Sequence, residues 1–379
     1  MFWKKLLYTW IFIIIIFLSA IISILYLIDP INIYGSKIIK GLNHYKIKEN
    51  LFFDISKPYQ YEKLKPNEVI IGSSRVYVGL NPFFSNNMYN FGQSSMSFRD
   101  LENYIDFILK IHKPEKVYIG LDFFQFSKQN FYLHREGFSV NRLDKITKYT
   151  NTPIIYYLKI QENMSFIYYI LDTVKYSWKN RNLNSCYQKG ADFGRGQSGD
   201  INKKEYYHFI NSFVKQYSEW QYEPNSIETL KRIVEKLKNS NVETVIFFNP
   251  ISIDLLLALD VTNKNDEFYY IKEKVAEFTN FYDFNYANNI TEQRNNFYDA
   301  SHYNMKTGNI IFYNICNNDK DENIVLECNS NNINNIILLE SEKFNDWKIA
   351  NYDYYMYLKR KTINKEKIKE KELYDFIGF

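Results

Sequence analysis

Three residue types that together perform acyl transfer occur in two short segments of this sequence. Ser74 follows Gly72 and Ser73 directly after a short apolar run. Asp299 lies three residues before His302. A serine hydroxyl is a weak nucleophile until a base removes its proton, and a histidine base needs a partner that holds its tautomer. The two segments therefore predict a nucleophile (Ser74), a general base (His302) and an orienting carboxylate (Asp299).

Each segment alone also has a purely structural interpretation. Gly-Ser-Ser is a common turn sequence, and Asp299 is a suitable N-cap for a helix that begins near Met305. The remaining four histidines have no matched acid and are expected at the surface or at the edge of the core: His44, His112, His134 and His208.

Short apolar runs alternate with helical patterns through the middle of the chain. The runs that favour strands are Asn67–Ile71, Met88–Phe91, Val117–Leu121, Val242–Phe248 and Phe281–Phe284. Helical spacing of apolar residues occurs between them, as in Ser97–His112. This alternation predicts an α/β fold with a parallel sheet and right-handed crossovers.

Chemically useful residues follow the carboxyl ends of these predicted strands. Ser74, Gly92 and Asp122 come after the first three strands. Asp299 and His302 follow the last of them. Because parallel α/β sheets bind ligands at the carboxyl ends of their strands, we expect these residues to share one site.

An uncharged segment from Leu6 to Ile28 dominates the N-terminus. As a helix it extends roughly 34 Å, enough to cross a bilayer core of about 30 Å. Lys4 and Lys5 precede it, which favours an N-terminus inside the cell and a globular part outside. A cleaved signal peptide is the alternative. The segment is long for the roughly 7–15 apolar residues of a signal peptide, and no Ala-x-Ala site follows it, so we favour an uncleaved anchor.

These patterns predict an N-terminal transmembrane anchor (1–30), a tether (31–66), an α/β domain (67–317) with an insertion around 151–226, and a C-terminal helical extension (318–379). The insertion is either a lid or acceptor-binding wall, or a structural elaboration away from the site. Within it, Gly190–Asp200 is expected to be a flexible loop. In the extension, Asn335–Leu339 favours a short strand, and Asp346–Tyr374 favours helix.

Composition argues against two classes of function. The net charge is +4, and the basic residues are scattered among nearly as many acidic ones, which does not favour nucleic-acid binding. Cys186, Cys316 and Cys328 have no metal-type spacing, so no zinc site is expected. Either Cys316 and Cys328 form a disulfide, or all three cysteines are free.

Four blocks of the sequence resemble those of the SGNH (GDSL-like) hydrolase superfamily. They are Gly72–Arg75, Asn90–Gly92, Gly120–Asp122 and Asp299–His302, in the family's order and within residues 67–312. With the single anchor, the chain is most similar to the membrane-anchored bacterial branch of DltD-like and polysaccharide O-acetylation-like proteins. The resemblance implies a flavodoxin-like three-layer sandwich, O-acyl esterase or transferase activity, and no cofactor or metal.

The resemblance also assigns roles to individual residues. Ser74 matches the nucleophile, His302 the base and Asp299 its orienting partner. The backbone N–H groups of Ser74 and Gly92 match two donors of the oxyanion hole.

Two positions in these blocks depart from the usual family pattern. Ser73 replaces an aspartate, as it does in DltD-like members. Asp122 replaces an asparagine whose amide donates to the oxyanion, and an ionised carboxylate does not donate and repels negative charge. Asp122 is therefore protonated, or faces Arg75 or another cation, or the hole has only two donors. We favour the last two alternatives.

The expected function is that of an anchored, extracytoplasmic esterase or acyltransferase acting on cell-envelope polysaccharide. Its substrates would be an acylated glycan or an acyl donor, and the resemblance implies a polytopic membrane O-acyltransferase as partner. A lysophospholipase-like esterase would use the same triad. The alternative from another class is a catalytically inactive binding or assembly component of polysaccharide modification or export. Asp122 and the aromatic-rich Phe123-Phe124 and Pro153–Lys175 favour that alternative.

Overall fold

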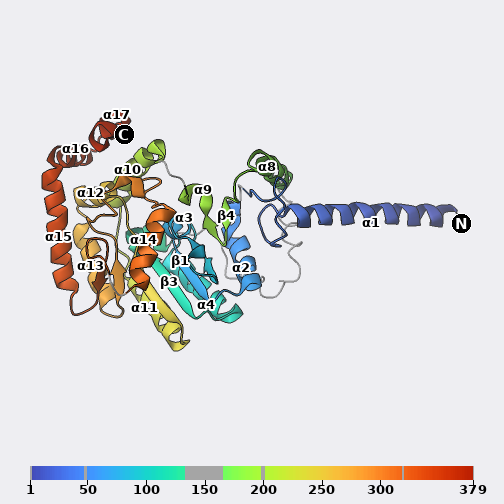
Figure 1. Ribbon diagram of the computed structural model, residues 1–379, viewed down its shortest axis with the longest axis horizontal. Helices are drawn as coiled ribbons and strands as arrows, with labels where there is room; N and C mark the ends of the chain where they lie inside the picture. Colours follow the sequence, from blue (N-terminus) through green and yellow to red (C-terminus); the bar gives the residue numbers. More distant parts are fainter. Residues whose placement is uncertain (1, 47–48, 133–164, 198–200, 318–319, 379) are drawn as a thin grey trace. The chain divides into compact units, whose positions relative to one another are not determined.

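The computed structural model describes residues 2–46, 49–132, 165–197, 201–317 and 320–378 (Figure 1). The chain forms two compact units, residues 1–65 with 136–188 and residues 66–135 with 189–379. The first unit includes the expected anchor and tether and the first part of the expected insertion. His134 and residues 151–164 of that insertion lie outside the described residues.

The second unit is built around a six-stranded sheet of order β2-β1-β3-β6-β7-β8. The strands are β1 (Glu68–Gly72), β2 (Met88–Asn90), β3 (Lys116–Leu121), β6 (Glu243–Phe248), β7 (Phe281–Asp283) and β8 (Leu326–Cys328). The first five strands in this order are parallel, and β8 joins β7 antiparallel. The predicted α/β class with a mostly parallel sheet is therefore confirmed.

Helices surround the sheet of the second unit, and the first unit is mostly helical. In the second unit they are α3 (Ser74–Gly79), η2 (Pro82–Phe84), α4 (Phe98–Ile111), η3 (Phe123–Phe126), α5 (Lys128–Phe131), α9 (Phe193–Gly196), α10 (Lys203–Ser218), α11 (Pro224–Asn239), α12 (Ile253–Val261), α13 (Asn265–Ala276), η4 (Arg294–Asn296), α14 (Met305–Cys316), α15 (Ile333–Ala350), α16 (Tyr352–Ile363) and α17 (Glu370–Ile377). In the first unit they are α1 (Phe2–Ile28), η1 (Glu49–Phe52), α2 (Phe53–Leu64) and α8 (Ser165–Lys179). Two short strands, β4 (Tyr187–Gln188) and β5 (Ala191–Asp192), complete the elements.

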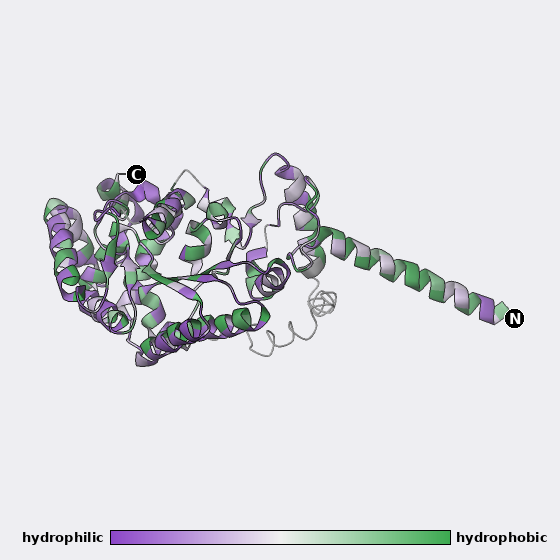
Figure 2. Ribbon diagram, turned by 60° about the horizontal axis from the view of Figure 1, so that its bottom comes forward, coloured by the Kyte–Doolittle hydropathy of each residue, from purple (hydrophilic) through white to green (hydrophobic). Residues whose placement is uncertain are grey.

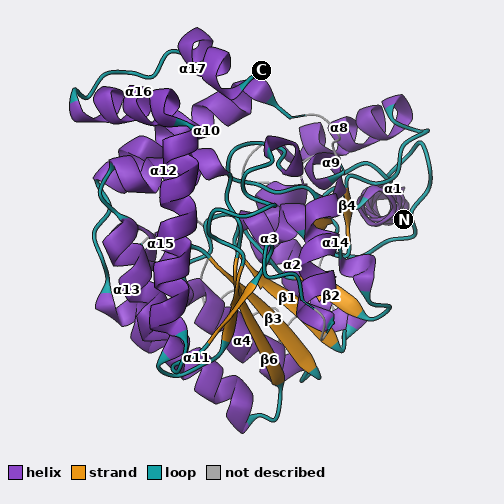
Figure 3. Cartoon of the chain, turned by 60° about the vertical axis from the view of Figure 1, so that its left-hand side comes forward, coloured by secondary structure: helices purple, strands orange, loops and turns teal. Residues whose placement is uncertain are grey.

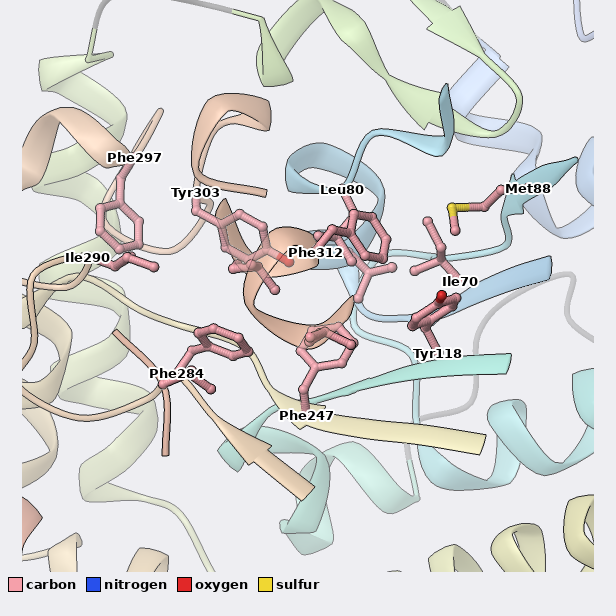
Figure 4. Close-up of a cluster of buried hydrophobic side chains, with 14 residues drawn as sticks. Ile70, Leu80, Met88, Tyr118, Phe247, Phe284, Ile290, Phe297, Tyr303 and Phe312 are labelled. Carbon is pink, nitrogen blue, oxygen red and sulfur yellow. The ribbon is translucent and has the colours of Figure 1, made fainter. Parts of the chain in front are cut away.

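The sheet has a helical layer on each face (Figure 3). Ile70, Tyr118 and Phe247 point from one face into a core shared with α3 and α14 (Figure 4). Helices α4 and α11 pack together over the other face. Because side chains alternate between the faces of a strand, strands buried on both faces appear in the sequence as continuous apolar runs.

The C-terminal extension differs from its prediction. It contributes strand β8 to the edge of the sheet, so the sheet continues beyond residue 317. The strand expected over Asn335–Leu339 is wrong, because these residues lie within α15. The buried residues of α15 follow helical spacing, at Ile333, Ile336 and Phe344, whereas Leu338 in the same apolar run is 63% exposed. The run therefore continues around the helix instead of forming a strand.

The loop expected over Gly190–Asp200 is also partly regular. Residues 191–196 form β5 and the short helix α9, and residues 198–200 lie outside the described part of the chain.

The three cysteines form no disulfide. Of the two expected alternatives, the structure agrees with the second, because Cys186, Cys316 and Cys328 are all free thiols.

Helix α1 is long and apolar enough to span a membrane. Its 27 residues extend roughly 40 Å, and Figure 2 shows hydrophobic residues along most of its length. Only Leu25 and Ile28 of this helix are buried, both near its C-terminal end. This is the single helix with such properties among the described residues.

A buried charged cluster links the C-terminal helices to the sheet. Lys272 on α13 places Nζ 2.6 Å from a carboxylate oxygen of Asp283 and 2.6 Å from one of Glu340. All three side chains are buried. Burial raises the pKa of Glu340 well above its ordinary value, and the nearby Asp283 adds to this against the opposing effect of Lys272. One buried lysine therefore faces two buried carboxyl groups.

We predict that Glu340→Gln reduces the loss of stability as the pH rises above the ordinary glutamate pKa of 4.5. A raised folded-state pKa stabilises the folded protein below the ordinary pKa of 4.5, and this contribution is lost as the pH rises through the folded-state value. Glutamine does not ionise, so the variant is expected to lose less of its resistance to denaturant than the wild type as the pH rises above 4.5. Chemical denaturation across a pH series measures this. Glu342→Gln, an exposed change on the same helix, is the control, and identical pH profiles for the Glu340 variant and wild type would contradict the prediction.

Candidate active site

Ser74 is presented by a tight turn between β1 and α3. Gly72, the last residue of β1, has φ +154°, and a Cβ there would lie 2.6 Å from the carbonyl oxygen of Gly120. Only glycine therefore allows β1 to pair with β3 and turn at this point. The Ser73 hydroxyl then caps α3 by accepting a hydrogen bond from the Arg75 N–H at 3.2 Å. Ser74 is consequently the first residue of α3 and remains half-buried, with its hydroxyl at the carboxyl end of β1.

Asp299 organises the turn that carries His302. One of its carboxylate oxygens accepts hydrogen bonds from the N–H groups of Ser301 at 2.8 Å and His302 at 2.9 Å. Its other oxygen lies 2.8 Å from His302 Nδ1. The N-cap of α14 is Asn304, whose side chain accepts from the Thr307 N–H. Asp299 is therefore not the cap of that helix, and the structural alternative for this residue is wrong.

The fold brings Ser74 and His302 together although 228 residues separate them. His302 Nε2 lies 2.8 Å from Ser74 Oγ. Because the Asp299 carboxylate accepts only, Nδ1 of His302 carries a proton and the neutral Nε2 accepts from the serine hydroxyl. A carboxylate, an imidazole and a hydroxyl thus form one continuous chain of hydrogen bonds. Such an arrangement can remove the proton of the hydroxyl when it attacks a carbonyl carbon.

Asp299 remains ionised in spite of its burial. Burial opposes the charged form, but His302 and the two backbone N–H groups outweigh it, so that the pKa of Asp299 lies below its ordinary value of 3.8. The negative charge is therefore available to hold the Nδ1 proton and to stabilise an imidazolium.

We predict that this lowered pKa contributes to acid sensitivity. Ionised Asp299 stabilises the folded state at pH values above about 4, and the contribution is lost as the pH falls through the lowered folded-state pKa. Asp299→Asn is expected to be less stable than wild type near neutrality and to depend less on pH in the acid range. Urea denaturation between about pH 3 and pH 6 measures both effects. The exposed Asp346→Asn is the control, and an unchanged acid dependence in the Asp299 variant would contradict this account.

A buried arginine joins the two segments of the site. Arg75 Nη1 lies 2.5 Å from Asp122 Oδ1 at the end of β3. Its Nε donates to the backbone oxygen of Ser301 at 3.0 Å, and its Nη2 donates to the Ser301 hydroxyl at 3.0 Å. Arg75 follows Ser74 in sequence, and Ser301 precedes His302. The guanidinium therefore fixes the turn of Ser74 and the turn of His302 to the same point of the sheet.

Aromatic side chains enclose this guanidinium. The rings of Phe124 and Phe213 lie 5.3 and 5.6 Å from Arg75 Cζ. Burial opposes the charge of Arg75, but Asp122, Tyr217 and Asp299 outweigh that effect and raise its pKa. Arg75 therefore stays positively charged in an almost dry environment, where its ion pair with Asp122 is only weakly screened.

The expectation that Asp122 faces Arg75 agrees with this geometry. Asp122 also accepts a hydrogen bond from Asn249 Nδ2 at 3.3 Å, and the Asn249 side-chain oxygen accepts from the Tyr303 hydroxyl at 2.9 Å. Asn249 is a member of the site that sequence analysis missed. It directly follows β6, as Asp122 follows β3, so its place after a strand was the signal that could have identified it.

Gly92 does not match its expected role in this conformation. Its N–H donates to the Asn90 side-chain oxygen at 3.0 Å, within a turn that follows β2. Ser73 and Arg75, grouped with Gly92 as binding residues, are buried and engaged within the protein. Of the two expected oxyanion donors, the Ser74 N–H is the one at the first position of a helix, where the N–H lacks an intrahelical partner.

Helix α10 forms one wall of the site. The ring of Phe209 packs edge-on against His302, with 5.3 Å between centroids and an interplanar angle of 82°. Phe213 on the next turn contacts Arg75 as described above. Helix α10 belongs to the expected insertion, so this part of the insertion lies against the site rather than away from it.

No metal-binding group is present among the described residues, since nowhere do three or more His, Cys, Asp or Glu side chains cluster suitably. The candidate site consists of Ser74, His302 and Asp299, with Arg75 and Asp122 in contact with its turns. No family model and no curated protein matches the chain.

Proposed function

We propose that this protein is a serine-dependent O-acyl esterase or acyltransferase with Ser74 as its nucleophile. The observation that carries the proposal is the 2.8 Å distance between Ser74 Oγ and His302 Nε2, with Asp299 behind the imidazole. In the first step, Oγ bonds to the ester carbonyl carbon while His302 takes the hydroxyl proton. The imidazolium then gives this proton to the departing alcohol oxygen, which leaves an acyl-serine.

The acyl-serine is released by reversing these steps with a second hydroxyl. Water or a sugar hydroxyl passes its proton to His302 and bonds to the acyl carbon, and Ser74 recovers its proton. Water gives hydrolysis and a sugar gives transfer. In both steps the carbonyl oxygen becomes negative, and the Ser74 N–H at the first position of α3 is the backbone donor that this turn offers to it.

The substrate class rests on the family resemblance and the apolar N-terminal helix. If α1 anchors the protein in the membrane, the α/β unit is extracytoplasmic. If the protein belongs to the DltD-like branch of SGNH-like enzymes, this unit has a flavodoxin-like fold. Its substrate is then an acyl group carried by, or delivered to, cell-envelope polysaccharide. A polytopic membrane O-acyltransferase would supply that group.

An ester panel tests the proposed substrate class. Purified full-length protein is incubated with O-acetylated oligosaccharides, and with lysophospholipid as the competing ester. Mass spectrometry follows free acetate, free fatty acid and acylated acceptor sugar. We expect turnover of the sugar esters and none by Ser74→Ala. Rapid turnover of the lipid ester alone would reject the glycan substrate and favour a lysophospholipase-like enzyme.

A non-catalytic role in polysaccharide assembly is the second candidate. The observation that favours it is the state of the expected oxyanion hole, because Gly92 donates to Asn90 and Asp122 is an acceptor paired with Arg75. Complementation of a deletion strain separates the candidates. Normal glycan acylation with the Ser74→Ala protein would support the assembly role and reject catalysis.

A further inference from the structure

Helix α8 of the first unit buries polar side chains and exposes apolar ones. Thr173 and Ser177 are 2% and 0% exposed. Ile167, Leu171 and Trp178 are 62%, 57% and 65% exposed, and their spacing of four and seven residues places them on one face. A helix that faces water has the reverse arrangement, with its apolar stripe toward the core. The exposed face of α8 is therefore suited to an apolar environment.

The polar side of α8 is fixed by the segment that follows the anchor. The Ser177 hydroxyl accepts a hydrogen bond from the Tyr45 N–H at 2.9 Å. One turn further on, the Asn180 carbonyl oxygen lies 3.1 Å from His44 Nε2. These bonds set the rotation of α8 about its own axis, so the apolar face cannot turn inward without breaking them.

Helix α8 packs against α1, and Figure 1 shows it beside the C-terminal end of α1. The buried residues of α1, Leu25 and Ile28, lie at this end. Figure 3 views α1 nearly end-on and shows α8 next to it, running crosswise to its axis. If α1 crosses a bilayer, a helix that lies across its end runs along the bilayer surface.

The exposed side of α8 also has the composition of a membrane interface. Tyr168 and Trp178 are amphipathic aromatics of the kind found at headgroup level. Lys175, Lys179 and Arg181 are exposed on or just after this helix, and the Arg181 guanidinium lies 5.2 Å from the Trp178 ring. Such basic residues interact with anionic lipid headgroups while apolar neighbours enter the acyl region.

We propose that α8 is an interfacial helix embedded in the headgroup region of the bilayer that α1 spans. The lipid surface covers Ile167, Leu171 and Trp178. The first unit is then held at the membrane by two differently oriented helices, which restricts its tilt and rotation more than a single anchor would. This inference concerns a surface remote in sequence from Ser74 and is independent of the proposed chemistry.

Spin labelling of the full-length protein tests this placement. The exposed Cys316 is replaced by serine, and single cysteines are introduced by Leu171→Cys on α8 or by Leu64→Cys on α2. Leu64 is the matched control because it is a leucine of the same unit with 51% exposure. A parent without an introduced cysteine corrects for the buried Cys186 and Cys328. The labelled proteins are reconstituted into vesicles of phosphatidylethanolamine and phosphatidylglycerol, and accessibility to oxygen and to a water-soluble nickel complex is measured.

The label at position 171 is expected to lose most of its accessibility to the nickel complex while remaining accessible to oxygen, whereas the label at position 64 stays accessible to both. This pattern should persist when the protein is diluted in excess lipid. Equal accessibility of the two positions would overturn the proposal. Protection at position 171 that disappears on dilution would also overturn it, because the face would then be covered by a second copy of the chain.

Discussion

Replacing Ser74 by alanine is expected to lower kcat for ester cleavage by about 10⁴-fold or more. The variant lacks the oxygen that forms the acyl-enzyme, and neither His302 nor Asp299 can substitute for it. Ser74 is half-buried and its hydroxyl bonds to His302, so the fold should be retained. Initial rates with an activated acetyl ester, with the unfolding temperature of each protein, measure the effect.

The control is Ser94→Ala, which removes an exposed hydroxyl that bonds to Tyr77 and not to His302. This variant should retain nearly wild-type kcat. Equal rates for the Ser74 variant and the wild type, with both folded, would show that Ser74 is not the nucleophile.

Asp122→Ala is expected to reduce the free energy of unfolding by about 3–5 kcal/mol. The change leaves the Arg75 guanidinium buried without its ionic partner, and the aromatic rings around it carry no negative charge to replace the carboxylate. Replacing both residues, in Arg75→Leu/Asp122→Ala, removes the buried charge as well. The double variant should therefore lose less stability than the sum of the two single variants.

Denaturant unfolding of the four proteins in this double-mutant cycle measures the coupling between Arg75 and Asp122. Both single variants should also lower kcat, because Arg75 holds the turn that carries Ser301 and His302. Rescue of stability without rescue of kcat in the double variant is the result expected of a positioning arginine. Strictly additive losses of stability would contradict the ion-pair account.

The sequence allowed the positions of five strands along the chain and the polar residues at their ends to be predicted. Strands buried on both faces appear as apolar runs, and their carboxyl ends must meet at one edge of a parallel sheet. That argument was sufficient to expect Ser74 near His302. It failed for Asn335–Leu339, where five residues were too few to distinguish a strand from part of the helix α15.

The hydrogen bonds of the supporting residues were less accessible to sequence analysis. The Gly92 N–H has an alternative acceptor two residues away, and local sequence does not decide which one it uses. Asn249, which contacts Asp122, directly follows β6 and lies more than a hundred residues after Asp122 in the sequence. Such contacts depend on the pairing of β3 with β6, and the spacing of apolar residues in the sequence does not specify which strands pair. The inverted polarity of α8 was likewise not predicted, because the sequence of a helix does not show what covers each of its faces.

Covalent labelling by a fluorophosphonate tests the central claim most directly. The reagent phosphonylates a serine only when an adjacent base activates it, and peptide mass spectrometry identifies the residue. We expect a single modified position, Ser74, with labelling abolished in Ser74→Ala and strongly slowed in His302→Ala. Labelling at another residue, or none in a folded protein at high reagent concentration, would contradict a nucleophile activated by His302.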